Sequence, residues 1–333
     1  MKTILVAGGA GYIGSHMVAL LVKRGYEVVV ADNLRTGHWQ AVKGARKMYV
    51  GDLRDGAFLH QIFTENKIDG VINFAAFSLV GESVTNPLKY YGNNVEGAVS
   101  LLSAMQAHGV DKIVFSSTAA AYGEPEKQPV TEQTPRKPAT SPYGNTKQMC
   151  EDILRDSLAA YPGMKGIALR YFNPIGAHPS ALIGELPRGV PQNLVPYITQ
   201  TAAGIRECLS VFGDDYPTPD GSNIRDYIDV VDLAKAHVAA IRRMIEDRNK
   251  ARYEVFNIGT GRGVSVLELV HRFEQVNRLK LNYKIVGRRA GDIVAIWADP
   301  SYANNELGWR AERSLDETLA AAWKWEKHIR GIE

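Results

Sequence analysis

Short runs of branched apolar residues recur along the chain, separated by stretches whose apolar positions follow a helical spacing. The runs occupy residues 3–7, 27–31, 47–50, 70–74, 112–115, 166–172 and 254–258. Strands buried on both faces of a parallel sheet read as continuous apolar runs, because neither side meets water. The pattern predicts an α/β fold with a doubly wound parallel sheet of the Rossmann type, whose strands end at one ligand-binding edge.

The composition changes between residues 176 and 225. The segments GAHPSALIGELPRGVPQNLVP and FGDDYPTPDGSNIRD are rich in Pro, Gly and Asp, and long loops of this kind usually cover a site. Capping-box pairs, Ser265 with Glu268 and Ser314 with Glu317, indicate two helices near the C-terminus. We therefore expect a sheet domain and a smaller C-terminal α/β substrate domain. The predicted boundaries are residues 1–175 plus 226–259 for the first and residues 176–225 plus 260–333 for the second.

Composition and charge narrow the classes of partner. The chain has 333 residues, 45% of them hydrophobic, and its 39 basic and 36 acidic residues leave a net charge of +3. We find no run of five or more like charges, so we expect no nucleic-acid or membrane partner, whereas a small anionic substrate is compatible. The two cysteines and eight histidines form no metal-binding or disulfide spacing, which predicts no metal site and fits a reducing cytoplasm.

A glycine-rich loop, GGAGYIG, lies between the first apolar run and a helical stretch. It offers two dinucleotide frames, Gly8 or Gly9 followed by Gly11 and Gly14. Either frame lets the backbone approach a pyrophosphate at a helix N-terminus. Asp32 ends the second strand and can accept hydrogen bonds from both ribose hydroxyls while repelling a 2′-phosphate, which favours NAD over NADP. Arg35 keeps the NADP alternative open.

The segment SPYGNTK places Tyr143 and Lys147 at i and i+4, on one face of a helix that Pro142 can start. A fixed ammonium close to a phenol can lower its pKa, ordinarily ~10, by roughly 1 to 3 units. Tyr143 could then exchange a proton with a sugar or alcohol hydroxyl while a hydride moves to or from the cofactor. The spacing alone is a weak signal, but the pair follows the fifth strand and the hydroxyl-rich segment FSSTAAAYG.

These motifs, together with LRYFNPIGAHP, resemble the extended short-chain dehydrogenase/reductase family. YYGNNVEG, GVPQNLVPYI, FGDDYPTPDGSNIRDYI, FNIGTG and RRAGD further resemble the UDP-glucose (UDP-galactose) 4-epimerases, so the resemblance covers essentially the whole chain. It implies an isomerase of nucleotide-sugar metabolism that retains NAD and interconverts UDP-glucose and UDP-galactose through a transient 4-keto sugar. It also implies a homodimer. The apolar stretches at residues 95–106 and 149–159 could form its interface, although helices buried within the chain would show the same pattern.

The resemblance assigns roles to individual residues. The implied catalytic residues are Thr118, Tyr143 and Lys147. The implied NAD-binding residues are Gly8, Gly11, Tyr12, Ile13, Gly14, Asp32, Asn33, Asp52, Leu53, Phe74, Ala75, Ala76, Asn93, Tyr143, Lys147 and Tyr171. The implied UDP-sugar-binding residues are Thr118, Tyr143, Asn173, Asn193, Leu194, Phe212, Arg225, Arg289 and Asp292.

Some of the assigned residues also have purely structural interpretations. Guanidinium groups suit a diphosphate and an aromatic ring can pack on uracil. Arg225, however, could equally pair with Asp226 or Asp229, and Phe212 could be a core residue. Ile296 occupies the family position that limits room at the sugar 2-substituent, and its intermediate size leaves N-acetyl sugars open.

Several related activities remain as alternatives. A nucleotide-sugar 4,6-dehydratase would carry Asp and Glu where this chain has Ala119 and Ala120. A dehydrogenase that releases its cofactor, a non-catalytic dinucleotide sensor, and epimerases of UDP-glucuronate or UDP-pentoses are further alternatives. Without carboxylates at positions 119 and 120, return of the hydride is favoured over loss of water.

Overall fold

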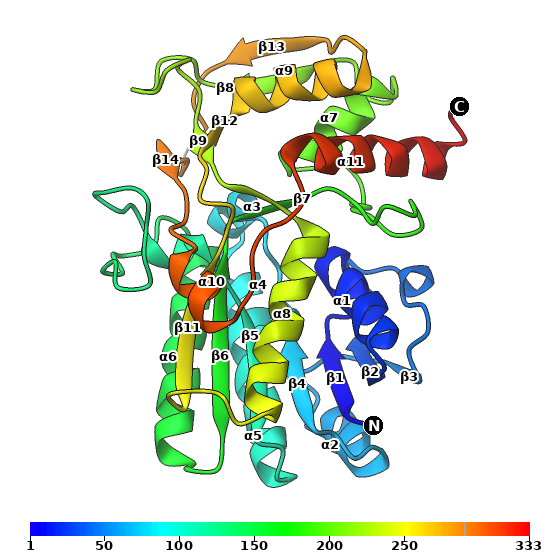
Figure 1. Cartoon of the computed structure of the whole chain (residues 1–333), viewed down its shortest axis with the longest axis vertical. Coiled ribbons are helices and arrows are strands. Elements are labelled where there is room, and N and C mark those ends of the chain that lie inside the picture. The colour runs from blue at the N-terminus through cyan, green and yellow to red at the C-terminus, as the bar shows by residue number, and fades with distance from the viewer. Residues whose placement is uncertain (290) are drawn as a thin grey trace.

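Seven parallel strands form the central sheet of the computed structural model, which describes residues 1–289 and 291–333. Their order across the sheet is β11-β6-β5-β4-β1-β2-β3, and every neighbouring pair is parallel (Figure 1). The strands are β1 Thr3–Ala7, β2 Glu27–Asp32, β3 Lys47–Val50, β4 Gly70–Asn73, β5 Lys112–Thr118, β6 Lys165–Tyr171 and β11 Tyr253–Ile258. All seven predicted strands, and the doubly wound parallel fold, are confirmed.

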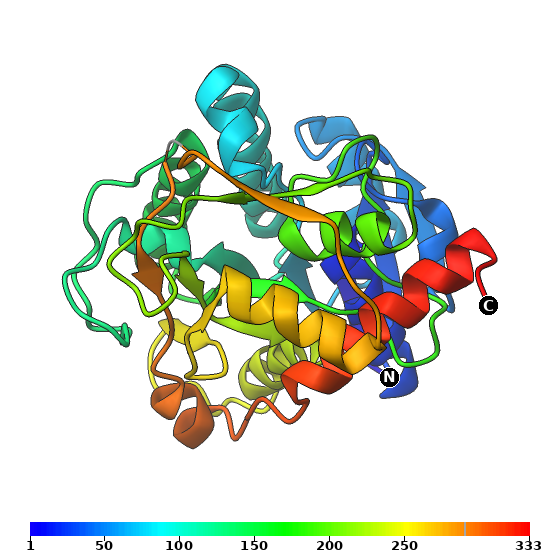
Figure 2. The same cartoon turned by 90° about the horizontal axis from the view of Figure 1, so that it is seen from above.

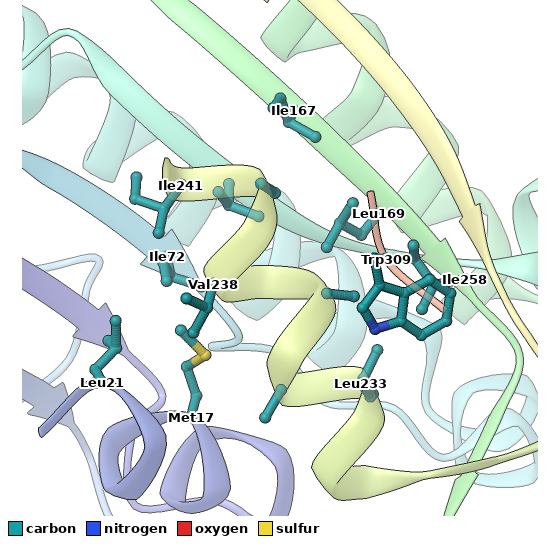
Figure 3. Packing of buried hydrophobic residues seen from close by; sticks show 14 of the residues in the cluster. Met17, Leu21, Ile72, Ile167, Leu169, Leu233, Val238, Ile241, Ile258 and Trp309 are labelled. Atoms are coloured by element: carbon teal, nitrogen blue, oxygen red, sulfur yellow. The ribbon is translucent and has the colours of Figure 1, made fainter. Parts of the chain in front are cut away.

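Helices cover both faces of this sheet. One face carries α1 (Tyr12–Lys23) and α8 (Val230–Ile245), and the other carries α2 (Gly56–Glu65), α5 (Glu96–Ala107) and α6 (Pro142–Ala160). Alternate strand residues enter opposite cores, since β1 sends Ile4 to the first face and Leu5 to the second. Figure 3 shows α8 beside α1, with side chains of both helices packed with residues of the strands and with Trp309 at one side of this core.

Strand β5 continues three residues beyond the predicted end at residue 115. Its last residues are polar, yet Ser116 and Ser117 are buried, and their hydroxyls form hydrogen bonds with Tyr171 and Glu151 respectively. Buried polar groups with partners are compatible with a central strand, although in the sequence they resemble a loop. The extension places Thr118 at the carboxyl edge of the sheet.

Short helical segments follow several strands of the sheet. They are η1 Trp39–Ala41, α3 Val80–Thr85, α4 Pro87–Tyr90, the π-helical segment η2 Tyr91–Val95 and the 3₁₀ segment η3 Ala119–Tyr122. Segment η3 directly follows β5, so the alanines of FSSTAAAYG form a tight helical turn at the carboxyl edge.

A smaller layer lies beyond that edge, above the sheet in Figure 1 and across it in Figure 2. Its elements are β7 Asn173–Ile175, α7 Leu194–Ala202, β8 Leu209–Phe212, β9 Ile224–Arg225, β10 Tyr227–Asp229, β12 Val264–Ser265, α9 Val266–Asn277, β13 Tyr283–Val286, β14 Ala295–Ile296 and α11 Leu315–Arg330. Helix α10 (Ser301–Glu306) instead lies against β11 of the sheet. Helices α7, α9 and α11 share a core with β8. The hydroxyls of Ser265 and Ser314 cap α9 and α11, as predicted.

The proposed boundary between the two units is not a simple cut along the chain. Ala303, Leu307 and Trp309 pack in the core of the sheet with α8 and β11, although the sequence placed them in the smaller unit. Conversely, Ile175 and Tyr227 belong to the core of the smaller layer. The division into two domains stays a prediction.

Candidate active site

A cavity of about 1160 Å³ lies at the carboxyl edge of the sheet, between the sheet and the smaller layer. It is lined by every residue predicted for the site except Phe212. The edge includes the switch point between β1 and β4, where neighbouring crossovers run in opposite directions. Ligands bind at this position in open α/β sheets.

The glycine loop between β1 and α1 forms one wall. Gly8 has φ +79°, and a Cβ there would lie 2.7 Å from the backbone nitrogen of Ala75, while a Cβ on Gly14 would lie 2.1 Å from the Gly8 carbonyl oxygen. A Cβ on Gly11 would meet only that oxygen, at 3.4 Å. Gly8 therefore allows the loop to approach the backbone that follows β4, and Gly14 allows α1 to pack closely on the loop, whereas Gly11 leaves room on the cavity side.

Helix α1 begins immediately after this loop. Its N-cap is Gly11, and no side chain caps the helix or places an acid in its first turn. The N–H groups of the first turn can therefore bind an anion, assisted by the helix dipole. This cradle fits a dinucleotide pyrophosphate.

Asp32 lies at the end of β2 beside the loop. Its two carboxylate oxygens accept hydrogen bonds from the Ala10 N–H at 2.9 Å and the Leu34 N–H at 2.8 Å. Burial raises the pKa of this carboxyl, and the two backbone donors partly oppose that effect. Each oxygen keeps a lone pair that can accept from a ribose hydroxyl, which fits the adenosine end of NAD.

Asp52 faces the same end of the cavity but is held by a neighbour. Arg54 donates to both of its oxygens, at 2.9 and 2.8 Å, and lowers the pKa of the Asp52 carboxyl. The Arg54 backbone N–H donates a third hydrogen bond at 3.1 Å, and Asn33 donates a fourth, longer one of 3.4 Å. Asp52 therefore stays ionised and fixed at the cavity wall.

The three predicted catalytic residues line the part of the cavity that β5 and α6 form. Helix α6 has Pro142 in its first turn and Ser141 as its N-cap, which places Tyr143 and Lys147 on its buried face. The Lys147 Nζ donates to the Ser116 carbonyl oxygen at 2.7 Å and lies 4.9 Å from the centre of the Phe115 ring. Thr118 ends β5 at the cavity, and its hydroxyl accepts from the Ala120 N–H at 3.2 Å.

We expected Lys147 to lower the pKa of the Tyr143 phenol, and this expectation is wrong. Burial raises the pKa of the Tyr143 phenol to about 12, and only the Thr118 hydroxyl works in the other direction. Burial also lowers the pKa of the Lys147 ammonium to about 8, against the charge of Glu151. The i, i+4 spacing showed proximity along the helix, but it could not show how completely both groups are removed from water.

A second cluster of charged groups lines the part of the cavity that faces the smaller layer. Arg289 donates to both oxygens of Asp292, at 3.1 and 2.8 Å, and the Arg225 guanidinium lies 3.9 Å from the same carboxylate. Arg225 does not pair with Asp226 or Asp229, which removes the alternative considered from the sequence. Asp226 accepts from backbone groups of the loop after β11, and Asp229 caps α8 and pairs with Arg313.

The cavity lining omits Phe212, which was predicted to bind the UDP-sugar, and includes Glu185, which was not predicted. Phe212, at the end of β8, lies outside the cavity lining and is 39% exposed, with the Arg289 guanidinium 5.4 Å from its ring centre. Glu185 lines the cavity, accepts from the Asn193 side chain at 2.7 Å, and has a pKa raised by burial to about 7. The sequence signalled only that its Pro- and Gly-rich loop covers a site.

Within residues 1–289 and 291–333, no group of three or more His, Cys, Asp or Glu side chains is arranged to hold a metal ion. None of the helices in this described part is long and apolar enough to cross a membrane.

Comparison with known proteins agrees with this architecture. The family model described as GDP-mannose 4,6 dehydratase matches residues 5–322. A UDP-glucose 4-epimerase of Bacillus subtilis is 50% identical over 97% of this chain and 96% of its own. The crystal structure of UDP-glucose 4-epimerase from Bifidobacterium longum in complex with NAD+ and UDP is 44% identical, with a TM-score of 0.94 and 100% of both chains covered.

A second solved structure is also similar over nearly the whole chain. The UDP-Glc/GlcNAc 4-epimerase from Campylobacter jejuni is 38% identical, with a TM-score of 0.84, over 98% of this chain and 100% of the other. The match to the family model and the full-length identity to curated epimerases decide the assignment. The chain belongs to the GDP-mannose 4,6 dehydratase family and, within it, to the UDP-glucose 4-epimerases.

Proposed function

We propose that this protein is an NAD-dependent epimerase that interconverts UDP-glucose and UDP-galactose at C4 of the sugar. One observation carries the proposal. Tyr143, Lys147 and Thr118 meet in the same cavity as the dinucleotide cradle, and Arg225 and Arg289 line its other end. A dinucleotide and a UDP-sugar can therefore occupy one continuous space.

NAD would be held by the open backbone at Gly11, the N-terminus of α1 and the carboxylate of Asp32. When bound, NAD accepts a hydride from the sugar C4 and gives it back, and its positive ring favours the ionised form of a nearby phenol. Lys147, which donates to the Ser116 carbonyl oxygen, would bind the nicotinamide ribose. The residues that line this part of the cavity fit the group.

The chain's own residues would handle the proton and the sugar. Tyr143 would take the proton of the 4-hydroxyl and return it, with Thr118 fixing the hydroxyl beside it. Burial raises the phenol pKa to about 12 and the Lys147 ammonium does not lower it, so the positive charge of the bound nicotinamide ring would supply the shift toward the phenolate. The transient 4-keto sugar would turn while Arg225 and Arg289 hold the diphosphate. The opposite face of the sugar would then meet the cofactor.

The residues after Thr118 support return of the hydride over elimination. Ala119 and Ala120 both line the cavity and provide neither an acid nor a base. A 4,6-dehydratase has to remove a proton at C5 and protonate a leaving hydroxyl at C6. The two alanines favour epimerisation although the matching family model is described as a dehydratase.

Substrate range depends on the wall near Ile296, which is buried in β14 and lines the cavity.

The assay that tests the proposal incubates the purified protein, without added NAD, with UDP-galactose, UDP-N-acetylgalactosamine, UDP-glucuronate and UDP-xylose. We expect UDP-glucose from UDP-galactose, detected by chromatography. If no substrate yields its C4 epimer, the proposed function is wrong, whereas product from only another sugar would reassign the substrate.

We also propose a cytoplasmic homodimer. Val99 on α5 and Met149 on α6 are apolar and exposed, and Leu88 on the adjacent α4 is 82% exposed. Joining such a face to a second copy would bury apolar surface. Light scattering after size exclusion should give twice the chain mass for the wild type and the single mass for Val99→Lys with Met149→Lys.

The proposed cytoplasmic location is supported by the cysteines, because both are free thiols, as in a reducing compartment.

A further inference from the structure

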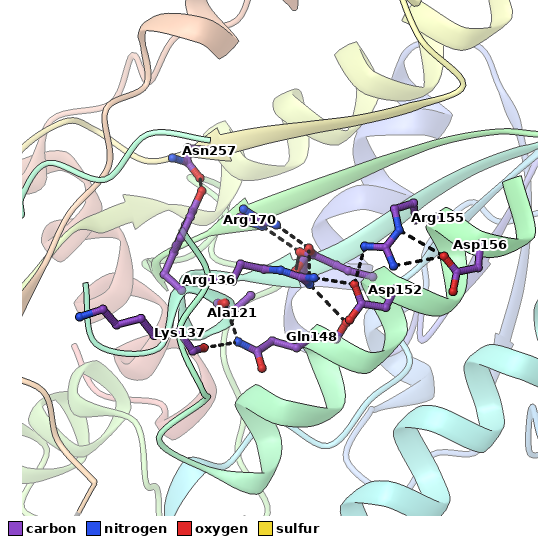
Figure 4. A network of polar contacts seen from close by, with 12 residues as sticks. Ala121, Arg136, Lys137, Gln148, Asp152, Arg155, Asp156, Arg170 and Asn257 are labelled. Carbon is purple, nitrogen blue, oxygen red and sulfur yellow. Dashed lines mark hydrogen bonds and ion pairs between the residues drawn. The ribbon is translucent and has the colours of Figure 1, made fainter. Parts of the chain in front are cut away.

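A buried ion pair lies directly behind the catalytic segment. Arg170 of β6 donates to both oxygens of Glu151 on α6, at 2.9 and 2.6 Å, and the two side chains are 6% and 2% exposed. Figure 4 shows Arg170 within a polar network that joins β6 to α6. Neither residue lines the cavity, so neither can touch the substrate.

The pair is connected to the strand that carries Thr118. Ser117 directly precedes Thr118, and its hydroxyl donates a hydrogen bond to Glu151. Glu151 itself follows Lys147 by one turn of α6, and Lys147 donates to the carbonyl of Ser116. Successive turns of the helix are thus tied to successive residues of β5.

The same network holds the segment after Thr118. Gln148 of α6 donates to the Ala121 carbonyl of η3 at 2.9 Å (Figure 4). The Arg170 guanidinium lies 4.8 Å from the ring centre of Tyr122, whose hydroxyl donates to Asn257 at 2.6 Å. Both sides of Thr118 are therefore fixed relative to the helix that carries Tyr143.

The energetics argue against a role in stability alone. Removing two charges from water costs about as much as their attraction returns, so a buried ion pair seldom adds net stability.

A second buried ion pair lies elsewhere in the fold and provides a control. Arg243 of α8 binds both oxygens of Glu254 in β11, at 2.8 and 2.9 Å, and both side chains are 4% exposed. That pair has the same chemistry but lies near the amino ends of the strands, outside the cavity lining.

We propose that Glu151 and Arg170 are positioning residues that set the spacing between Thr118 and the Tyr143–Lys147 face of α6. The inference rests on the proposed epimerase function. A hydroxyl and a phenol that share one proton must be aligned, and a misplacement of about 1 Å can cost about 100-fold in rate. Loss of the pair should therefore slow the chemical step and leave the binding of the UDP group intact.

The test compares Glu151→Gln with the matched control Glu254→Gln in the enzyme as purified. For Glu151→Gln we expect kcat to fall by about 100-fold with KM for the UDP-sugar within about threefold of wild type. For Glu254→Gln we expect a similar loss of thermal stability and an unchanged kcat. Equal kcat values for the two variants would overturn the proposal.

A double variant separates position from stability. Glu151→Leu with Arg170→Met removes both charges and restores apolar packing, so its melting temperature should return toward wild type. Its kcat should stay low, because the tie to Ser117 is gone, and a wild-type kcat would overturn the proposal. A wild type that epimerises no UDP-sugar would instead contradict the proposed function, which keeps the two failures distinct.

Discussion

Two buried histidines should limit the acid stability of this protein. His16 on α1 and His237 on α8 are 2% and 0% exposed, and their Nδ1 atoms lie 2.8 and 2.9 Å from the carbonyl oxygens of Tyr12 and Leu233. A carbonyl can only accept, so each Nδ1 carries the proton. Each Nε2 is then an unprotonated nitrogen without a hydrogen-bond partner in the described part of the chain. Burial lowers the pKa of both imidazoles from 6.5 to about 4.

The sign of the effect follows from proton binding. Between pH 6.5 and pH 4 the unfolded chain binds protons that folded His16 and His237 do not, so the free energy of unfolding falls as the pH falls. At about pH 5 each histidine should cost about 2 kcal/mol, and the two together about 4 kcal/mol. Domains are typically stable by about 5–15 kcal/mol, so this loss is a large share of the total.

Urea unfolding followed by tryptophan fluorescence, at about pH 7.5 and about pH 5, measures the loss. The double variant His16→Leu with His237→Leu should recover about 4 kcal/mol of the difference between the two pH values. The exposed His271→Gln is the control and should behave as wild type. If the double variant loses as much free energy on acidification as wild type, the two histidines do not carry the effect.

Three further predictions concern the cavity. Tyr143→Phe should lower kcat by about 10²- to 10⁴-fold while calorimetry gives near-normal UDP binding, and retained turnover would exclude the phenol as the proton carrier. Gly14→Ala would place a Cβ 2.1 Å from the Gly8 carbonyl oxygen, so the purified variant should lack the absorbance of bound cofactor; full retention of NAD would refute the close-packing argument. The ammonium of Lys147 has a pKa of about 8, so kcat should decline as the pH rises through that value, and a flat profile there would show that the charge is not needed.

The fold and most of the site could be predicted because their signals are local in the sequence. A buried parallel strand leaves a continuous apolar run, and the glycine loop joins β1 to α1 within a few residues. Lys147 and Tyr143 are likewise one helical turn apart. The strand order then brings these segments to one edge, so separate motifs line a single cavity.

The features that the sequence did not reveal depend on partners far along the chain. Glu151 and Arg170 are 19 residues apart and on different elements. Arg170 lies in the segment LRYFNPIGAHP, but nothing in that segment indicates Glu151 as its partner. The carboxylate of Glu185 acquires its raised pKa only from the loop that buries it. The predicted direction of the Tyr143 pKa shift was wrong for the same reason, because burial is a property of the assembled fold.

The hydroxyl-rich end of β5 shows how a strand can divide such roles by its pleat. Consecutive strand residues point to opposite faces, so Ser116 and Thr118 share one side and Ser117 takes the other. The cavity lining agrees, because it includes Ser116 and Thr118 and omits Ser117, whose hydroxyl binds Glu151. A slip of one residue in the register of β5 would turn Thr118 away from the cavity. The contacts from α6 to Ser116 and Ser117 therefore hold the register that the proposed role of Thr118 requires.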